Sequence, residues 1–117
     1  MAGSPDPLST KTLVMKFGGT SVGTPAAMAQ VVAIVRAEKA RWRNVIIVTS
    51  ALSGITDLLL KMVADVAISE AIFREDAAQL LQRHEEIALA VVPDADLRNQ
   101  VMQQIGELVD RVVSLCT

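Results

Sequence analysis

The residues best suited to chemistry form one short stretch near the N-terminus, Lys16-Phe17-Gly18-Gly19-Thr20-Ser21. It begins within the last residues of a mostly apolar run, Leu13 to Phe17, that predicts a buried strand. The two glycines lack Cβ atoms and let backbone N–H groups approach an anion closely, while Lys16 adds a full positive charge. Thr24-Pro25 has the residue types of a helix N-cap and first turn, and the positive end of that helix would face the same point. The pattern predicts a phosphate-binding turn between a strand and a helix.

The order of residues separates this stretch from two better known phosphate-binding loops. In a Walker A loop the lysine follows the last glycine, and the dinucleotide fingerprint needs a third glycine in register, whereas here Lys16 precedes both glycines. A Gly-Gly pair after a strand is also common in tight turns, and a lysine beside it can be an ordinary solvated side chain. Spacing alone leaves both interpretations open.

A second stretch rich in hydroxyl groups runs Val48-Thr49-Ser50-Ala51-Leu52-Ser53-Gly54-Ile55-Thr56-Asp57. Gly54 permits a close backbone approach, and Asp57 suits the first turn of a following helix because a carboxylate is favourable there. Hydroxyl groups near a helix start are usually caps, so capping is the more common role for Ser53 and Thr56 taken by themselves.

Together the two stretches resemble the N-terminal signatures of aspartate kinases, which are members of the amino-acid kinase family. Both motifs occur in the order and at the separation that the family shows, and the resemblance is close through about Leu60 and looser beyond it. The Thr20-Ser21 pair favours aspartate over glutamate, acetylglutamate or nucleotide substrates. The resemblance implies ATP-dependent phosphorylation of the side-chain carboxylate of L-aspartate to 4-phospho-L-aspartate, the first step of lysine, threonine and methionine biosynthesis.

The resemblance also assigns roles to individual residues. It implies that Lys16 is catalytic, and that ATP comes with Mg²⁺ whose ligands lie outside this segment. It reverses the capping interpretation at Thr56. The implied contacts are, for the ATP phosphates, Lys16, Gly18, Gly19 and Thr20, and, for the amino-acid substrate, Ser21, Ser50 and Thr56.

The surrounding sequence predicts a βαβ unit. A helix is expected from Pro25 to Arg43, with Asn44 as its breaker and with one apolar face formed by Met28, Val31, Val32 and Val35. Val45 to Val48 is β-branched without alternation, as expected of a parallel strand covered on both faces. A right-handed crossover would bring the ends of both strands to one sheet edge, where α/β proteins bind ligands. The two stretches should therefore face each other across one crevice.

From Leu58 the chain is expected to be helical to its end, with Pro93 as a stop and Asp94 or Asp96 as the next cap. The last helix carries an apolar stripe that would face the core or a partner, formed by Leu97, Val101, Ile105, Leu108, Val112 and Leu115. Residues 1–10 are expected to be a disordered tail.

The expected fold class is α/β, the N-terminal βαβ part of an amino-acid-kinase-like parallel-sheet sandwich followed by helices. Residues 11–117 would form the first part of the catalytic domain, without its nucleotide half and ACT domains. Such a segment is expected to be inactive by itself, and the full-length enzyme to be a homo-oligomer. Two alternatives stay open: a kinase of this family that acts on another amino acid, and a non-catalytic module that binds an anion or a partner subunit.

Composition narrows the function classes. A chain of 117 residues is one domain's worth, and with 3% aromatic residues its core must be largely aliphatic. A formal net charge of −2 without a basic stripe argues against nucleic acid as a partner. Without a membrane-length apolar run or a secretory signal, the expected compartment is the cytoplasm. We expect His84, beside Glu85 and Glu86, to be a surface residue rather than a metal ligand, and Cys116 to be a packed thiol.

Overall fold

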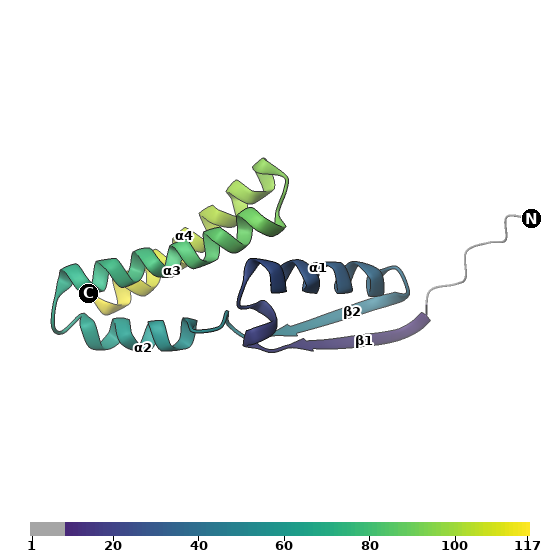
Figure 1. Ribbon diagram of the computed structural model, residues 1–117, viewed down its shortest axis with the longest axis horizontal. Coiled ribbons are helices and arrows are strands. Elements are labelled where there is room, and N and C mark those ends of the chain that lie inside the picture. The colour runs from purple at the N-terminus through teal and green to yellow at the C-terminus, as the bar shows by residue number, and fades with distance from the viewer. Residues whose placement is uncertain (1–8) are drawn as a thin grey trace, which may run out of the picture.

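A βαβ unit opens the described part of the chain and three helices follow it (Figure 1). The computed structural model describes residues 9–117. Its elements are β1 (Ser9–Phe17), the 3-10 helix η1 (Gly19–Val22), α1 (Pro25–Lys39), β2 (Trp42–Thr49), α2 (Ile55–Asp65), α3 (Glu70–Val91) and α4 (Ala95–Cys116). The predicted α/β class, a parallel βαβ start followed by a helical stretch, is confirmed.

The two strands pair in parallel along their whole predicted length. Leu13 lies opposite Val45, and Phe17 lies opposite Thr49. β1 begins earlier than expected, at Ser9, so Ser9 and Thr10 belong to the strand rather than to a tail. The rest of the predicted tail, residues 1–8, lies outside the described residues.

The sheet is covered on one face only. Phe17 and the α1 residue Val31 line the same hollow, which shows that α1 packs on the face that Phe17 shares with Leu13 and Met15. On the opposite face the side chains of Val14 and Ile46 are 60% and 51% exposed. The predictions of a buried first strand and of a second strand covered on both faces were therefore wrong. No element among the described residues packs on that second face.

The helix α1 begins as predicted and ends earlier. The Thr24 side chain caps it by accepting a hydrogen bond from the Ala27 N–H group at 3.1 Å, with Pro25 in the first turn. The helix stops at Lys39 rather than at Arg43. Trp42 already belongs to β2, and its indole Nε1 donates to Glu38 Oε2 at 2.8 Å, which ties the chain into a turn. Asn44, the predicted breaker, instead pairs with Thr12 inside the sheet.

The helical part contains one break that the sequence pattern did not predict. Residues 66–69 separate α2 from α3, and the Ser69 hydroxyl caps α3 by accepting from the Ile72 N–H group at 3.4 Å. The break at Pro93 is confirmed, and Asp94 is the cap of α4, with Oδ1 accepting from the Leu97 N–H group at 2.8 Å.

An ion-pair network joins α2 to α3. Lys61 Nζ lies 2.5 Å from Asp65 Oδ2 and 2.7 Å from Asp76 Oδ1, and Asp76 is only 2% exposed. The hydrogen bond from Lys61, followed by that with Asp76, lowers the pKa of Asp65 from its ordinary value of 3.8. The hydrogen bonds that Lys61 makes, to Asp65 first and to Asp76 second, raise the pKa of Lys61. The charges in this network therefore stabilise the hairpin of α2 and α3.

One apolar core connects the βαβ unit to the helices. Its most buried side chains include Phe73 and Met62, at 1% and 0% exposed. α3 contacts α1, α2 and α4 and is therefore the central helix of the molecule. The overall shape is long, 70 × 27 × 23 Å, with a radius of gyration of 18.3 Å against about 13 Å for a compact chain of this length. The core members are Val22, Val31, Leu52, Ile55, Met62, Phe73, Leu80 and Ile87.

The last helix packs on the core with part of the predicted stripe and with neighbouring residues, and Ile105, Leu108 and Val112 of the stripe border an apolar hollow against α2 and α3. Its half-buried contacts are Val109, Val112, Val113 and Cys116, so only Val112 of the predicted stripe belongs to this group, while the prediction of a packed Cys116 thiol is confirmed. Leu97, Leu108 and Leu115 are 52%, 58% and 85% exposed. Among the described residues, no helix combines the length and the hydropathy needed to cross a membrane.

Candidate functional site

Two loops follow the strands at the same edge of the sheet. The first loop, residues 18–24, follows β1, and the second loop, residues 50–54, follows β2. They begin side by side, because Phe17 pairs with Thr49 and the Ser50 N–H group donates to the Phe17 carbonyl oxygen at 3.2 Å. The parallel crossover thus brings both predicted motifs to one place, as expected.

The first loop turns directly into the short helix η1. The Ser21 N–H group donates to the Gly18 carbonyl oxygen at 3.0 Å, which closes the first turn. The N–H groups of Gly19 and Thr20 stand at the leading positions of this turn, where a helix offers no internal acceptor. A Cβ atom placed on Gly18 would meet nothing within 4 Å. The Gly18 side of the loop is therefore open to an approaching group.

The two loops pack backbone against backbone through glycines. A Cβ atom on Gly19 would lie 3.4 Å from the Ala51 carbonyl oxygen, and one on Gly23 would lie 2.7 Å from Ser53 Cβ. Gly19 thus has a packing role besides the anion-binding role that its position suggested. Gly23 was missed by sequence reasoning, although its place just before the Thr24 cap is where a close approach between loop and helix would need a glycine.

The second loop leaves its hydroxyl groups uncommitted. Gly54 is the N-cap of α2 with φ of 82°, a left-handed conformation that favours glycine, and no side chain caps this helix. The more common capping role of Ser53 and Thr56 therefore does not apply. Ser50 and Thr56 are both exposed, and Asp57 lies in the first turn of α2 as predicted.

The remaining predicted residues lie on two sides of the strand end. Lys16 pairs with Val48 on the uncovered sheet face, where its side chain is exposed and forms no ion pair with a described residue. Thr20 and Ser21 line a hollow of about 250 Å³ beside α1. Gly54 lines a separate hollow of about 410 Å³ beside α3. The loops thus touch each other rather than bordering one enclosed crevice.

Arg83 of α3 joins the two loops, and no sequence pattern pointed to it. Its Nη2 atom donates to the Ser53 carbonyl oxygen at 2.8 Å and to the Gly23 carbonyl oxygen at 3.4 Å. Arg83 also lines the hollow that contains Gly54. A residue of the helical part thereby contacts both loops of the βαβ unit.

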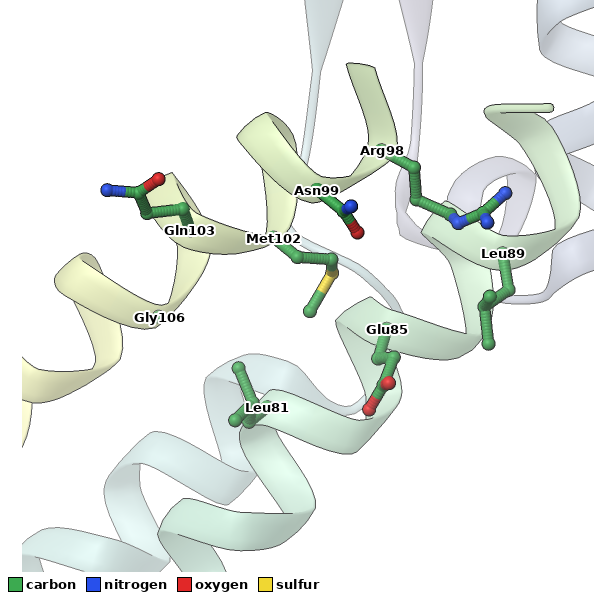
Figure 2. A pocket seen from close by; sticks show the side chains of 8 residues that line it. All are labelled: Leu81, Glu85, Leu89, Arg98, Asn99, Met102, Gln103 and Gly106. Carbon is green, nitrogen blue, oxygen red and sulfur yellow. The ribbon is translucent and has the colours of Figure 1, made fainter. Parts of the chain in front are cut away.

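His84 and the groove between α3 and α4 lie apart from these loops. His84 is half-buried rather than on the surface, with Nδ1 2.7 Å from the Leu80 carbonyl oxygen, because it borders an apolar hollow between α2, α3 and α4. Across residues 9–117 no cluster of three or more His, Cys, Asp or Glu side chains could hold a metal ion. The groove in Figure 2, about 560 Å³, is lined only from α3 and α4, by Leu81, Glu85, Leu89, Arg98, Asn99, Met102, Gln103 and Gly106.

Comparison of the sequence with known proteins identifies the family. The chain is 40% identical to an aspartokinase of Chlamydia muridarum over 76 residues, which are 65% of this chain. It is also 40% identical to an aspartokinase of Rickettsia bellii over 55 residues, which are 47% of this chain. It spans only 16% and 14% of the length of these relatives. The model of the amino acid kinase family matches residues 11–116, nearly all of the described structure. The chain therefore belongs to the amino acid kinase family, and its N-terminal region is similar to aspartokinases.

Proposed function

We propose that the complete protein carrying this chain is an aspartate kinase, which transfers the γ-phosphoryl group of ATP to the side-chain carboxylate of L-aspartate. The observation that carries the proposal is the contact between the two loops at one sheet edge, with Lys16 at the end of β1 beside them. The similarity to aspartokinases supports aspartate as the acceptor. The product would be 4-phospho-L-aspartate, which places the enzyme in lysine, threonine and methionine biosynthesis.

The chemistry makes modest demands on the protein. A carboxylate with a pKa of about 4 is already ionised at neutral pH, so the nucleophile needs no general base. The enzyme must instead bring two anions together, align them, and stabilise the charge on the transferring phosphoryl group. A fixed cation and preorganised N–H groups serve these needs best.

Charge stabilisation, phosphate binding and substrate binding are divided between Lys16 at the end of β1, the two loops and the start of α2. Lys16, exposed and without a carboxylate partner among the described residues, stabilises charge on the transferring group. Gly18, Gly19 and Thr20 offer backbone N–H groups to phosphate oxygens at the open turn of η1. Ser21, Ser50 and Thr56 provide hydroxyl groups for the amino-acid substrate, and the last two come from the second loop and the start of α2.

The magnesium ion that accompanies ATP would bind mainly through the nucleotide phosphates. The described residues contain no cluster of carboxylate, histidine or cysteine side chains that fits a metal ion. Magnesium usually binds through substrate phosphates with only one or two carboxylates. We therefore assign none of its ligands to residues 9–117.

The substitution Lys16→Met in the complete protein tests the proposal. Removal of one preorganised charge-stabilising donor should lower the rate of phosphoryl transfer by about a hundredfold to a thousandfold. The measurement traps the acyl phosphate with hydroxylamine after incubation with ATP, magnesium and aspartate. Lys39→Met is the matched control, because Lys39 is an exposed lysine in the last turn of α1, away from the loops, and its loss should leave the rate unchanged.

Two results would contradict the proposal. A Lys16→Met protein with normal turnover would remove Lys16 from the catalytic role. Hydroxamate formation with glutamate or acetylglutamate, but not with aspartate, would assign the protein to another amino-acid kinase of the same family.

A further inference from the structure

Arg83 gives the helical part of the chain a direct connection to both loops. Its guanidinium group donates to a carbonyl oxygen of each loop, at 2.8 Å to Ser53 and at 3.4 Å to Gly23. The first distance is that of a strong hydrogen bond, and the second is longer than the usual range and therefore a weaker contact. Ser53 and Gly23 precede Arg83 by 30 and 60 positions in the sequence, so the connection exists only in the folded chain.

The base of this connection is rigid. Leu80 and Ile87, three positions before and four after Arg83, are 4% and 8% exposed and belong to the core. All three residues lie on one face of α3, because positions three and four apart share a face. The α3 helix also contacts α1, which follows the first loop. Arg83 is thus held in place by the packing of its own helix.

The charge of Arg83 is not used in an ion pair. The ion pairs among residues 9–117 join other side chains, and none of them includes Arg83. Arginine presents five N–H donors in a planar fork, which can bind two acceptors in a fixed geometry, whereas lysine offers only a compact point charge. Both loop carbonyls are bound by one nitrogen of the guanidinium group, Nη2, whose two N–H bonds lie in the plane of that group.

We propose that Arg83 is a positioning residue that sets the spacing between the first loop and the second loop. This inference rests on the proposed function, in which the first loop binds the ATP phosphates and contributes Ser21 to the amino-acid site, while Ser50 of the second loop binds the amino acid. Two reacting anions must be held in line, and a misplacement of about 1 Å can cost on the order of a hundredfold in rate. The helices after residue 60 therefore contribute to the geometry of the site and not only to the core.

The substitutions Arg83→Met and Arg83→Lys in the complete protein test the inference with two readouts. The first is amide hydrogen exchange in residues 18–24 and 50–54, which should become faster in Arg83→Met while exchange in the sheet and in α3 stays unchanged. The second is steady-state kinetics, in which kcat should fall by about tenfold to a hundredfold. Arg83→Lys keeps the positive charge, but its side chain is shorter and lacks the planar N–H donors that bind both carbonyls, so it should recover only part of the loss.

Arg74→Met is the control for the loss of an arginine from α3, because Arg74 is exposed and bonds only to Glu70 one turn away. It should leave loop exchange and kcat unchanged. Unchanged loop exchange in Arg83→Met would overturn the inference, and so would full activity in Arg83→Lys, which would show that charge alone matters. If Arg83→Met does not fold, Arg83→Lys decides by the same two measurements.

The two proposals can fail separately. A wild-type protein that phosphorylates no amino acid would refute the proposed function, while loop exchange would still test the positioning role of Arg83. A wild-type aspartate kinase in which Arg83→Met has normal exchange and normal kcat would refute the positioning role alone.

Discussion

Replacement of Gly23 by alanine should push the two loops apart. The added Cβ atom would lie 2.7 Å from Ser53 Cβ and 3.0 Å from the Gly19 carbonyl oxygen, whereas ordinary contacts begin at 3.4 Å. The second loop must therefore move by about 0.7 Å, the difference between 3.4 and 2.7 Å. The backbone of Gly23, with φ of −80° and ψ of −17°, is one that alanine adopts freely, so the whole effect is steric.

The expected cost is that of overpacking a tight contact, about 1–3 kcal/mol. For a domain of this size that corresponds to a fall in Tm of about 4 °C per kcal/mol. Thermal unfolding followed by circular dichroism measures it. Gly106→Ala is the control, since a Cβ atom there meets nothing within 4 Å and α4 should gain about 0.5–1 kcal/mol from the better helix former.

A double-mutant cycle identifies the source of the cost. Ser53→Gly removes the Cβ atom that the new side chain would meet, so the double variant Gly23→Ala with Ser53→Gly should be more stable than the sum of the single effects predicts. Additive single effects, or a Gly23→Ala protein with the Tm of the wild type, would refute the idea that the loops are in direct contact here.

Three further predictions concern the substrate hydroxyls, the core and acid stability. In the complete protein, Ser50→Ala or Thr56→Ala should raise the KM for aspartate more than the KM for ATP; a larger effect on ATP at both positions would reverse the two ends of the site. Phe73→Ala should lower the free energy of unfolding by about 3–5 kcal/mol in urea titrations, because Phe73 is 1% exposed, and a loss below 1 kcal/mol would contradict its central place in the core. Because the pKa of Asp65 is lowered in the folded state, its ionised carboxylate stabilises the fold above pH 3.8, and this contribution is lost as the pH falls through the folded-state pKa. Lys61→Met should therefore make the free energy of unfolding fall less steeply with decreasing pH. An unchanged dependence on pH would mean that Lys61 does not lower this pKa.

Local sequence patterns determined the βαβ unit and the place of both motifs. The apolar run before Lys16 predicted β1, and Thr24-Pro25 predicted the start of α1, which begins at Pro25. Asp94 predicted the start of α4 in the same way. These predictions hold because capping and turn chemistry depend on neighbours in the chain. The parallel pairing of the two strands then leaves the two loops at one sheet edge.

The helix ends and the exposure of surfaces were decided by contacts that no local pattern contains. α1 stops at Lys39 because Trp42 enters β2 and donates to Glu38. Val14 and Ile46 are exposed because α1 packs on the other face of the sheet, although their apolar character predicted burial. The stripe of α4 is divided for the same reason: Val112 packs on the core, whereas Leu97 and Leu115 are exposed.

The candidate site shows the same division between sequence and structure. By itself the sequence located Lys16, the glycine pair and the hydroxyls of the second motif, whose types and order carry their chemistry. Only the tertiary structure selected Arg83 and Gly23. Each acts on a residue at least 30 positions away, through a hydrogen bond or a steric contact that forms when α3 packs and the loops meet. Such contacts depend on distance in space rather than on spacing in the chain, and for that reason no sequence pattern pointed to Arg83, and the place of Gly23 before the Thr24 cap did not identify its partner.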